Sequence, residues 1–158
     1  MVAIVSHMKK DWTVDSPTEL QPIAQAILEN HKSYVVVPLV ISLQGDLGAG
    51  KTAFTQELGK LLGVTEVITS PTFTIMKQYQ TTHPQWQTLV HIDAYRLESE
   101  AETIPLHIEQ IISQPNTISC IEWPEIIPAS IPDSAYQLQI EILKDERRRV
   151  TITLGKEQ

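Results

Sequence analysis

The sequence contains a single cysteine, Cys120, which lies in an apolar run typical of a strand. One cysteine cannot form a disulfide within the chain, so we expect a protein of the reducing cytoplasm. No polar base precedes Cys120 closely in the sequence, which favours a buried, inert thiol over a catalytic nucleophile.

Long apolar runs are also missing. The longest, at 35–43 and 118–121, are far too short to span a bilayer. Residues 1–10 have no apolar stretch followed by a cleavage site, so we expect neither a signal peptide nor any contact with a membrane.

Positive charge is scarce as well. The net charge of −7 disfavours direct binding to nucleic acid, because cationic contacts to phosphates supply most of the non-specific affinity of proteins for nucleic acids. If the protein acts on RNA, we expect a partner to hold that RNA. The length of 158 residues and the 42% hydrophobic content predict one domain over residues 1–158.

The strongest signal is the phosphate-binding P-loop motif Gly-x-x-x-x-Gly-Lys-Thr at 45–52. It follows an apolar run and opens an amphipathic segment at 53–62, so it joins a strand to a helix. Glycines let the loop backbone approach an anion, and the helix start adds its positive dipole end. Lys51 then supplies a charge for the β- and γ-phosphates, and the Thr52 hydroxyl is suited to Mg²⁺.

Hydrophobic periodicity predicts the elements around this motif. The run at 35–43 is apolar at nearly every position, as in parallel sheets covered on both faces, with its central strand beginning after Pro38. Two alternating segments near the end predict an antiparallel hairpin that turns at Asp145 and Glu146. Further predicted strands cover 12–14, 74–79, 88–93 and 117–122, with a hairpin turn at 83–85.

Helices are predicted over three segments. The first is expected to begin with a capping box from Ser16 to Glu19 and to end near His31. The second is the helix after the P-loop, ending at Leu62 with Gly63 as a left-handed cap. The third covers 98–112, where Pro105 should break or kink it.

A P-loop enzyme needs a further acid at a strand end to hold Mg²⁺ or to activate water. Asp93 and Glu122 each end an apolar strand, and the sequence alone does not decide which does which. Our hypothesis is that Glu122 and Thr52 together position the metal, while Asp93 orients or deprotonates the attacking water.

Other polar residues are weaker candidates. His91 shares a strand face with Asp93, but no third zinc ligand stands out, which favours a structural or supporting role. Thr72 and Thr74 could sense a γ-phosphate. The arginine run at 147–149 is usually a solvated turn, yet it could supply a cation to a nucleotide.

Four stretches together resemble the bacterial TsaE family of ATPases in tRNA threonylcarbamoyladenosine biosynthesis. They are Gly45–Thr52, Ser70–Thr74, His91–Leu97 and Ile121–Glu125, in the family's order and spacing. The resemblance implies a P-loop NTPase-like three-layer α/β fold. Its mixed, mostly parallel sheet is flanked by helices, and the C-terminal hairpin is antiparallel.

The resemblance also implies ATP and Mg²⁺ as cofactors and a weak ATPase that works with partners. Those partners are the threonylcarbamoyl-transferase subunit and its inactive paralogue, which bring tRNA to the complex. Asp93 and Lys51 are then the catalytic residues, and Thr52, Glu122 and Asp93 hold the metal. The implied nucleotide-binding residues are Asp46, Leu47, Gly48, Ala49, Gly50, Lys51, Thr52, Ala53, Trp123 and Arg147, with Ser16 and Pro17 near the adenine.

The sequence departs from the family at two places and leaves other functions open. Ala53 replaces a second threonine, and the region 103–110 lacks a glycine and contains Pro105. A small-molecule kinase and a nucleotide-dependent binding switch with little hydrolysis remain alternatives, although few arginines are present to form a kinase lid. A GTPase is disfavoured because the sequence has no Asn-Lys-x-Asp stretch.

Overall fold

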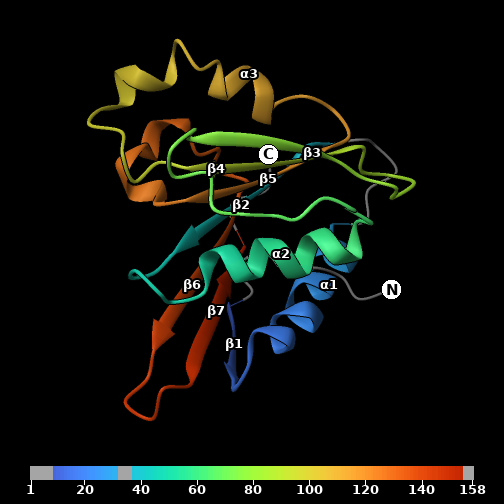
Figure 1. The fold of residues 1–158 in the computed structure, drawn as a ribbon, viewed down its shortest axis with the longest axis vertical. Helices are drawn as coiled ribbons and strands as arrows, with labels where there is room; N and C mark the ends of the chain where they lie inside the picture. Colours follow the sequence, from blue (N-terminus) through green and yellow to red (C-terminus); the bar gives the residue numbers. More distant parts are fainter. Residues whose placement is uncertain (1–8, 32–36, 155–158) are drawn as a thin grey trace.

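The predicted strands join into one seven-stranded sheet in a computed structural model that describes residues 9–31 and 37–154 (Figure 1). Across the sheet the order is β1 (Lys9–Val14), β7 (Arg148–Thr153), β6 (Tyr136–Ile142), β2 (Leu39–Gln44), β5 (Thr117–Glu122), β4 (Thr88–Asp93) and β3 (Met76–Gln80). The neighbours β6, β2, β5 and β4 run parallel to one another. The pairs β1–β7, β7–β6 and β4–β3 are antiparallel. These pairings confirm the predicted mixed sheet and its terminal hairpin.

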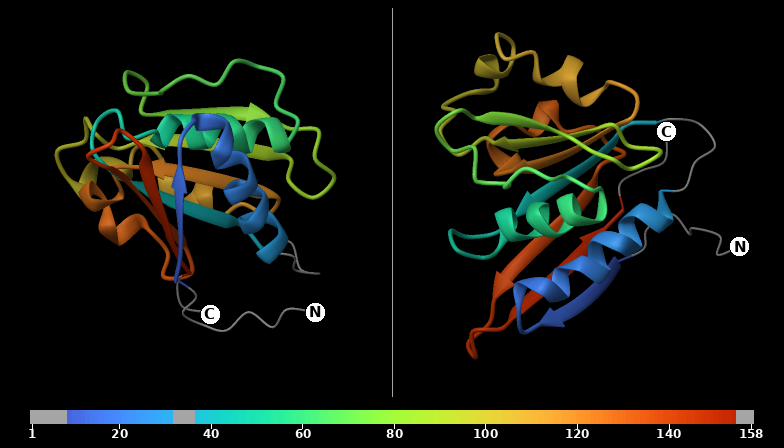
Figure 2. Two further views of the ribbon diagram at one scale, coloured as in Figure 1. Left: turned by 90° about the horizontal axis from the view of Figure 1, so that it is seen from below. Right: turned by 45° about the vertical axis from the view of Figure 1, so that its right-hand side comes forward.

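Helices cover both faces of this sheet. The views in Figures 1 and 2 place α1 (Leu20–Asn30) and α2 (Lys51–Leu61) on one face, while α3 (Ile108–Ile112) lies on the other. Short 3₁₀ helices complete the connections: η1 (Pro17–Glu19), η2 (Glu100–Thr103), η3 (Pro124–Ile126) and η4 (Pro128–Ser130). The arrangement is the predicted three-layer α/β fold. In the described part of the chain, no helix is both long and apolar enough to cross a bilayer.

Each helix buries the face that its periodicity predicts. In α1 the buried side chains are Leu20, Ile23, Ala24 and Ile27. They join Phe54 and Leu58 of α2 in an apolar core against the sheet. A separate core lies on the other face, around Val90, Ile92 and Ile108. Cys120 is fully buried, and this burial raises the pKa of its thiol to about 12, consistent with the expected inert cysteine.

The start of α1 differs from the predicted capping box. The Ser16 hydroxyl bonds to the Thr18 hydroxyl, and the Glu19 carboxylate accepts the N–H of Asp15. Pro22 has no N–H to offer the carbonyl of Thr18, so the α-helix cannot extend back over that residue. The chain therefore passes through η1 before α1 begins at Leu20.

Other element boundaries are mostly where the sequence predicts them. The central strand β2 begins directly after Pro38, and residues 35 and 36 of the predicted strand lie outside the described residues. The predicted helix at 98–112 is broken near Pro105, as the sequence indicates, because proline lacks the N–H that a continuous helix needs, and η2 and α3 lie on either side of the break. The strand predicted from Thr74 begins only at Met76, since Thr74 still belongs to a turn closed by its N–H bond to Pro71.

The end of α2 has the predicted glycine cap. Gly63 has φ +73°, its N–H bonds to the carbonyl of Lys60, and the N–H of Val64 bonds to the carbonyl of Gly59. This pair of bonds is the Schellman motif, which satisfies carbonyls at the end of a helix.

Candidate functional site

The loop at 45–50 connects the end of β2 to the first residue of α2, at the carboxyl edge of the parallel strands. Gly48 and Gly50 have φ values of +78° and +115°, which side chains with a Cβ rarely adopt. At Gly45 the constraint is space, since a Cβ there would lie 2.6 Å from the carbonyl oxygen of Ile140. The glycines are thus required by the loop's geometry, and the loop meets the start of an α-helix, where backbone N–H groups favour anions.

Lys51 lies against this loop and is 5% exposed. Its Nζ donates to the carbonyl oxygens of Gly45 at 2.6 Å and Asp46 at 2.9 Å. The same ammonium lies 4.5 Å from the ring centre of Trp123, within the range of a cation–π contact. The ammonium is therefore fixed beside the loop as a single positive charge.

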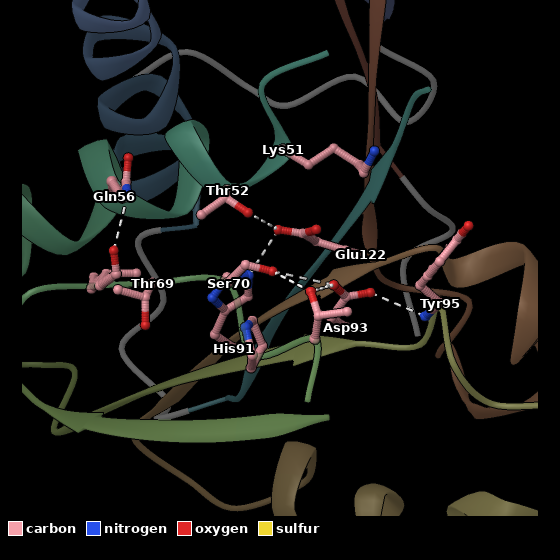
Figure 3. Close-up of polar contacts among 12 residues, drawn as sticks. Lys51, Thr52, Gln56, Thr69, Ser70, His91, Asp93, Tyr95 and Glu122 are labelled. Atoms are coloured by element: carbon pink, nitrogen blue, oxygen red, sulfur yellow. Dashed lines mark hydrogen bonds and ion pairs between the residues drawn. The ribbon is translucent and has the colours of Figure 1, made fainter. Parts of the chain in front are cut away.

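Thr52, the second residue of α2, meets the acid at the end of β5. Its hydroxyl donates to Oε1 of Glu122 at 2.7 Å, and Nε2 of His91 lies 2.9 Å from the same oxygen (Figure 3). Burial raises the pKa of Glu122, but the hydrogen bonds from His91 and Thr52 and the charge of Lys51 outweigh it. The net result is a lowered pKa, which keeps the carboxylate ionised.

Asp93 ends the neighbouring strand β4 and is paired in register with Glu122. Its Oδ2 accepts the Thr72 hydroxyl at 3.0 Å and the Ser70 hydroxyl at 3.4 Å, while Oδ1 accepts the N–H of Tyr95 at 3.0 Å (Figure 3). The loop before β3 is thereby tied to the strand end. Two carboxylates thus lie side by side at one sheet edge, as the sequence predicts for parallel strands.

These groups line one cavity of about 320 Å³ next to the P-loop. Its lining includes Lys51, Thr52, Ser70, Thr72, Asp93, Glu122 and Trp123. A second cavity of about 540 Å³ lies on the other side of the loop and shares Gly48, Gly50 and Ala53 with the first. The smaller cavity presents charged and hydroxyl side chains, and the larger one includes the apolar side chains of Pro17, Leu20 and Ile140. This pair of cavities suits a ligand with an anionic end and a ring system.

Comparison with known proteins agrees with this geometry. The family model described as "Threonylcarbamoyl adenosine biosynthesis protein TsaE" matches residues 14–150. This chain belongs to the TsaE family.

Relatives from several bacteria support the assignment. The "tRNA threonylcarbamoyladenosine biosynthesis protein TsaE" of Bacillus subtilis is 34% identical over 142 residues, which cover 90% of this chain and 84% of the relative. The protein of the same name from Rickettsia bellii is 37% identical over 115 residues, covering 72% and 76%. A crystal structure of Bacillus subtilis YdiB superposes with a TM-score of 0.69 at 28% identity, covering 97% of this chain and 90% of that one.

The structure places a different arginine at the loop from the one expected from the TsaE resemblance. Arg147 is not the arginine at the loop: its guanidinium pairs with Asp145 at 2.8 Å and is 50% exposed. Arg148 lies there instead and donates from Nε to the carbonyl of Ala49 at 3.1 Å and from Nη2 to that of Gly48 at 3.3 Å. On β7, Val150 and Ile152 are buried, so the alternation of a strand gives Arg148 the same face. The alternation of apolar residues at Val150 and Ile152 was the sequence signal that could have identified Arg148.

The remaining expected residues divide between the two cavities. Ser16 and Pro17 line the larger one with Leu20, Ile140 and Ile142, and Ala53 lines both. Leu47 lines the smaller cavity, whereas Asp46 contributes its carbonyl to Lys51. Thr74 is not part of either lining, since its hydroxyl faces the carbonyl of Pro71.

The described residues hold no group of three or more His, Cys, Asp or Glu side chains that could bind a metal alone. A zinc site at His91 and Asp93 is therefore not supported. The Thr52 hydroxyl and the Glu122 carboxylate are hard oxygen donors, which suit Mg²⁺ when phosphates and water complete its shell. The bond from His91 to Glu122 was not predicted as a specific contact.

Proposed function

We propose that this TsaE-family chain is an ATP-binding and ATP-hydrolysing subunit in the biosynthesis of threonylcarbamoyladenosine on tRNA, next to the anticodon. The relatives named for that pathway support the biological role. The observation that carries the chemistry is the convergence of Lys51, the Thr52–Glu122 pair and the Thr72–Asp93 pair on one cavity beside the P-loop.

The triphosphate is expected to bind along residues 46–53, with Lys51 and Arg148 as its cations. In the structure both cations hold carbonyl oxygens of the loop, so each can exchange those neutral acceptors for charged phosphate oxygens. Charge-assisted bonds are about twice as strong as neutral ones, which favours the exchange. Trp123 remains packed against the Lys51 side of the site.

Thr52 and Glu122 would hold Mg²⁺, which would neutralise negative charge on the phosphates during hydrolysis. Because the Thr52 hydroxyl donates its hydrogen to Glu122, its lone pairs are available to a cation. The lowered pKa of Glu122 keeps this neighbour anionic.

Asp93 is assigned to the attacking water. Thr72, Ser70 and the N–H of Tyr95 fix its carboxylate, and a fixed carboxylate can orient a water molecule and accept its proton. The nucleoside is assigned to the larger cavity, where Pro17, Leu20 and Ile140 offer apolar walls.

The proposed partners are the threonylcarbamoyl-transferase subunit and its inactive paralogue, with tRNA reached through them. The net charge of −7 supports this indirect contact with RNA. We also propose that residues 1–158 act as one ATPase domain, since a single sheet carries every element of the site.

The test is release of inorganic phosphate from ATP by the protein alone and with both partner proteins and tRNA. We expect slow release alone and clear stimulation by the full set, in the presence of Mg²⁺. Phosphate transferred to a metabolite would indicate a kinase instead. Nucleotide binding without turnover under every condition would indicate a binding switch.

A further inference from the structure

Of the histidines in the described residues, only His91 is fully buried, at 0% exposure. It lies on β4, in register with Cys120 of β5. Its Nδ1 finds no hydrogen-bond partner in the part of the chain that the structure describes. Burying a polar atom without a partner costs free energy, so packing alone would favour an aliphatic side chain at this position.

Among the described residues, the one polar partner of the His91 ring is Glu122. Nε2 lies 2.9 Å from Oε1, and since a carboxylate only accepts, Nε2 is the donor. No leucine or isoleucine could make this bond. The contact to Glu122 is therefore what the histidine adds to the strand.

This bond has a defined effect on the carboxylate. The Thr52 hydroxyl and His91 Nε2 both donate to Oε1, from two different elements, α2 and β4. Oε2 accepts no hydrogen bond from the described residues, and Glu122 lines the cavity beside the P-loop. Two donors on one oxygen fix the orientation of the group and leave the other oxygen for a ligand (Figure 3).

We propose that His91 is a positioning residue that orients the Glu122 carboxylate for Mg²⁺ bound with the nucleotide at Thr52. The proposal rests on the function proposed above. Partners that orient a metal ligand typically change metal affinity by about 10- to 100-fold when they are removed. His91 itself touches neither the metal nor the nucleotide.

The test compares the affinity for a non-hydrolysable ATP analogue by calorimetry, with Mg²⁺ and with EDTA. We expect His91→Leu to lower the ratio of the affinity in Mg²⁺ to the affinity in EDTA about tenfold, while the affinity in EDTA stays close to that of the wild type. His91→Gln can offer an amide N–H near the position of Nε2, and it should restore most of the ratio. His31→Leu removes a histidine outside the site and should leave the ratio unchanged.

Thermal unfolding of each variant checks that it is folded. If His91→Leu does not fold, His91→Met, which is long but has no N–H donor, takes its place. A wild-type ratio in the variant without a donor, or a glutamine variant as impaired as that variant, would overturn the positioning role. A wild-type protein that binds the analogue equally well in Mg²⁺ and in EDTA would contradict the proposed metal site itself.

Discussion

At the scale of single residues, the place of each arginine in the hairpin decides which one meets the P-loop. Arg148 shares the face of Val150 and Ile152, whereas Arg147 lies at the turn and pairs with Asp145. The cations and acids of the site otherwise end strands or begin a helix, while Ser70, Thr72 and Trp123 come from loops. Their identity was predictable, but their hydrogen bonds depend on which side chains the register brings together.

Arg148→Ala should weaken ATP binding about tenfold, and Arg147→Ala should change it by less than about twofold. The reason is that Arg148 bonds directly to the carbonyls of Gly48 and Ala49, while Arg147 is engaged with an exposed acid. Calorimetric titration with Mg·ATP measures both variants. Equal losses in the two would mean that only the net charge of the hairpin matters.

Asp93→Asn should retain nucleotide affinity and lower phosphate release by about 100-fold or more, because an amide cannot accept the proton of the attacking water. Asp133→Asn, an acid outside the Asp93 cavity, serves as the control and should hydrolyse ATP at the wild-type rate. Full hydrolysis by the Asp93 variant would remove the role assigned to this carboxylate.

At the scale of elements, periodicity predicted most of the fold. The continuous apolar run before Gly45 identified the central strand, because a strand buried on both faces is apolar at nearly every position. The alternation of apolar and polar residues from Tyr136 identified the hairpin, because its strands are buried on one face only. The P-loop followed from its motif, and Asp93 and Glu122 followed from their positions at strand ends. These parts of the candidate site needed no knowledge of tertiary contacts.

Missing N–H groups explain two of the helix boundaries. Pro105 divides the segment at 98–112, as the sequence indicates, and Pro22 shifts the start of α1 to Leu20. The capping box at Ser16 depended on an α-helical first turn that does not form. The choice of Arg147 depended on where the hairpin turn ends within the run of three arginines at 147–149. Three identical residues by themselves give no sequence signal for that position.

Gly63→Ala tests the cap that ends α2. Alanine would have to adopt the left-handed backbone of this position, and its Cβ would approach the side chain of Thr82. We therefore expect a loss of about 1–2 kcal/mol in the free energy of unfolding. Urea denaturation measures it. Glu66→Ala, at an exposed position shortly after the cap, should stay within about 0.5 kcal/mol of wild type.

At the scale of the whole molecule, the sheet separates two apolar cores, and aromatic contacts extend one of them to the end of α1. The His31 ring lies 5.7 Å from that of Trp86 and 6.1 Å from that of Tyr136. Burial lowers the pKa of His31, and the backbone bond to Val37 only partly offsets this. Protonation of His31 is therefore linked to global unfolding.

Stability should fall as the pH is lowered from about 7.5 to 5. The unfolded chain binds a proton at His31 near pH 6.5, the folded chain only at lower pH, so acid favours unfolding across that interval. Urea denaturation at the two pH values measures the loss, which should be smaller for His31→Gln. An identical loss in that variant would assign the effect to other groups, such as His83, whose pKa burial also lowers.

The sheet's strand order has a consequence for biogenesis. The strand that leads into the P-loop is flanked by β5 and β6, and Arg148 reaches that loop from β7, so its neighbours leave the ribosome long after it does. A nascent chain that has just exposed residues 45–52 carries the complete motif but lacks Asp93, Glu122 and Arg148. The arrangement seen around the loop therefore forms only after the hairpin of β6 and β7 has been translated.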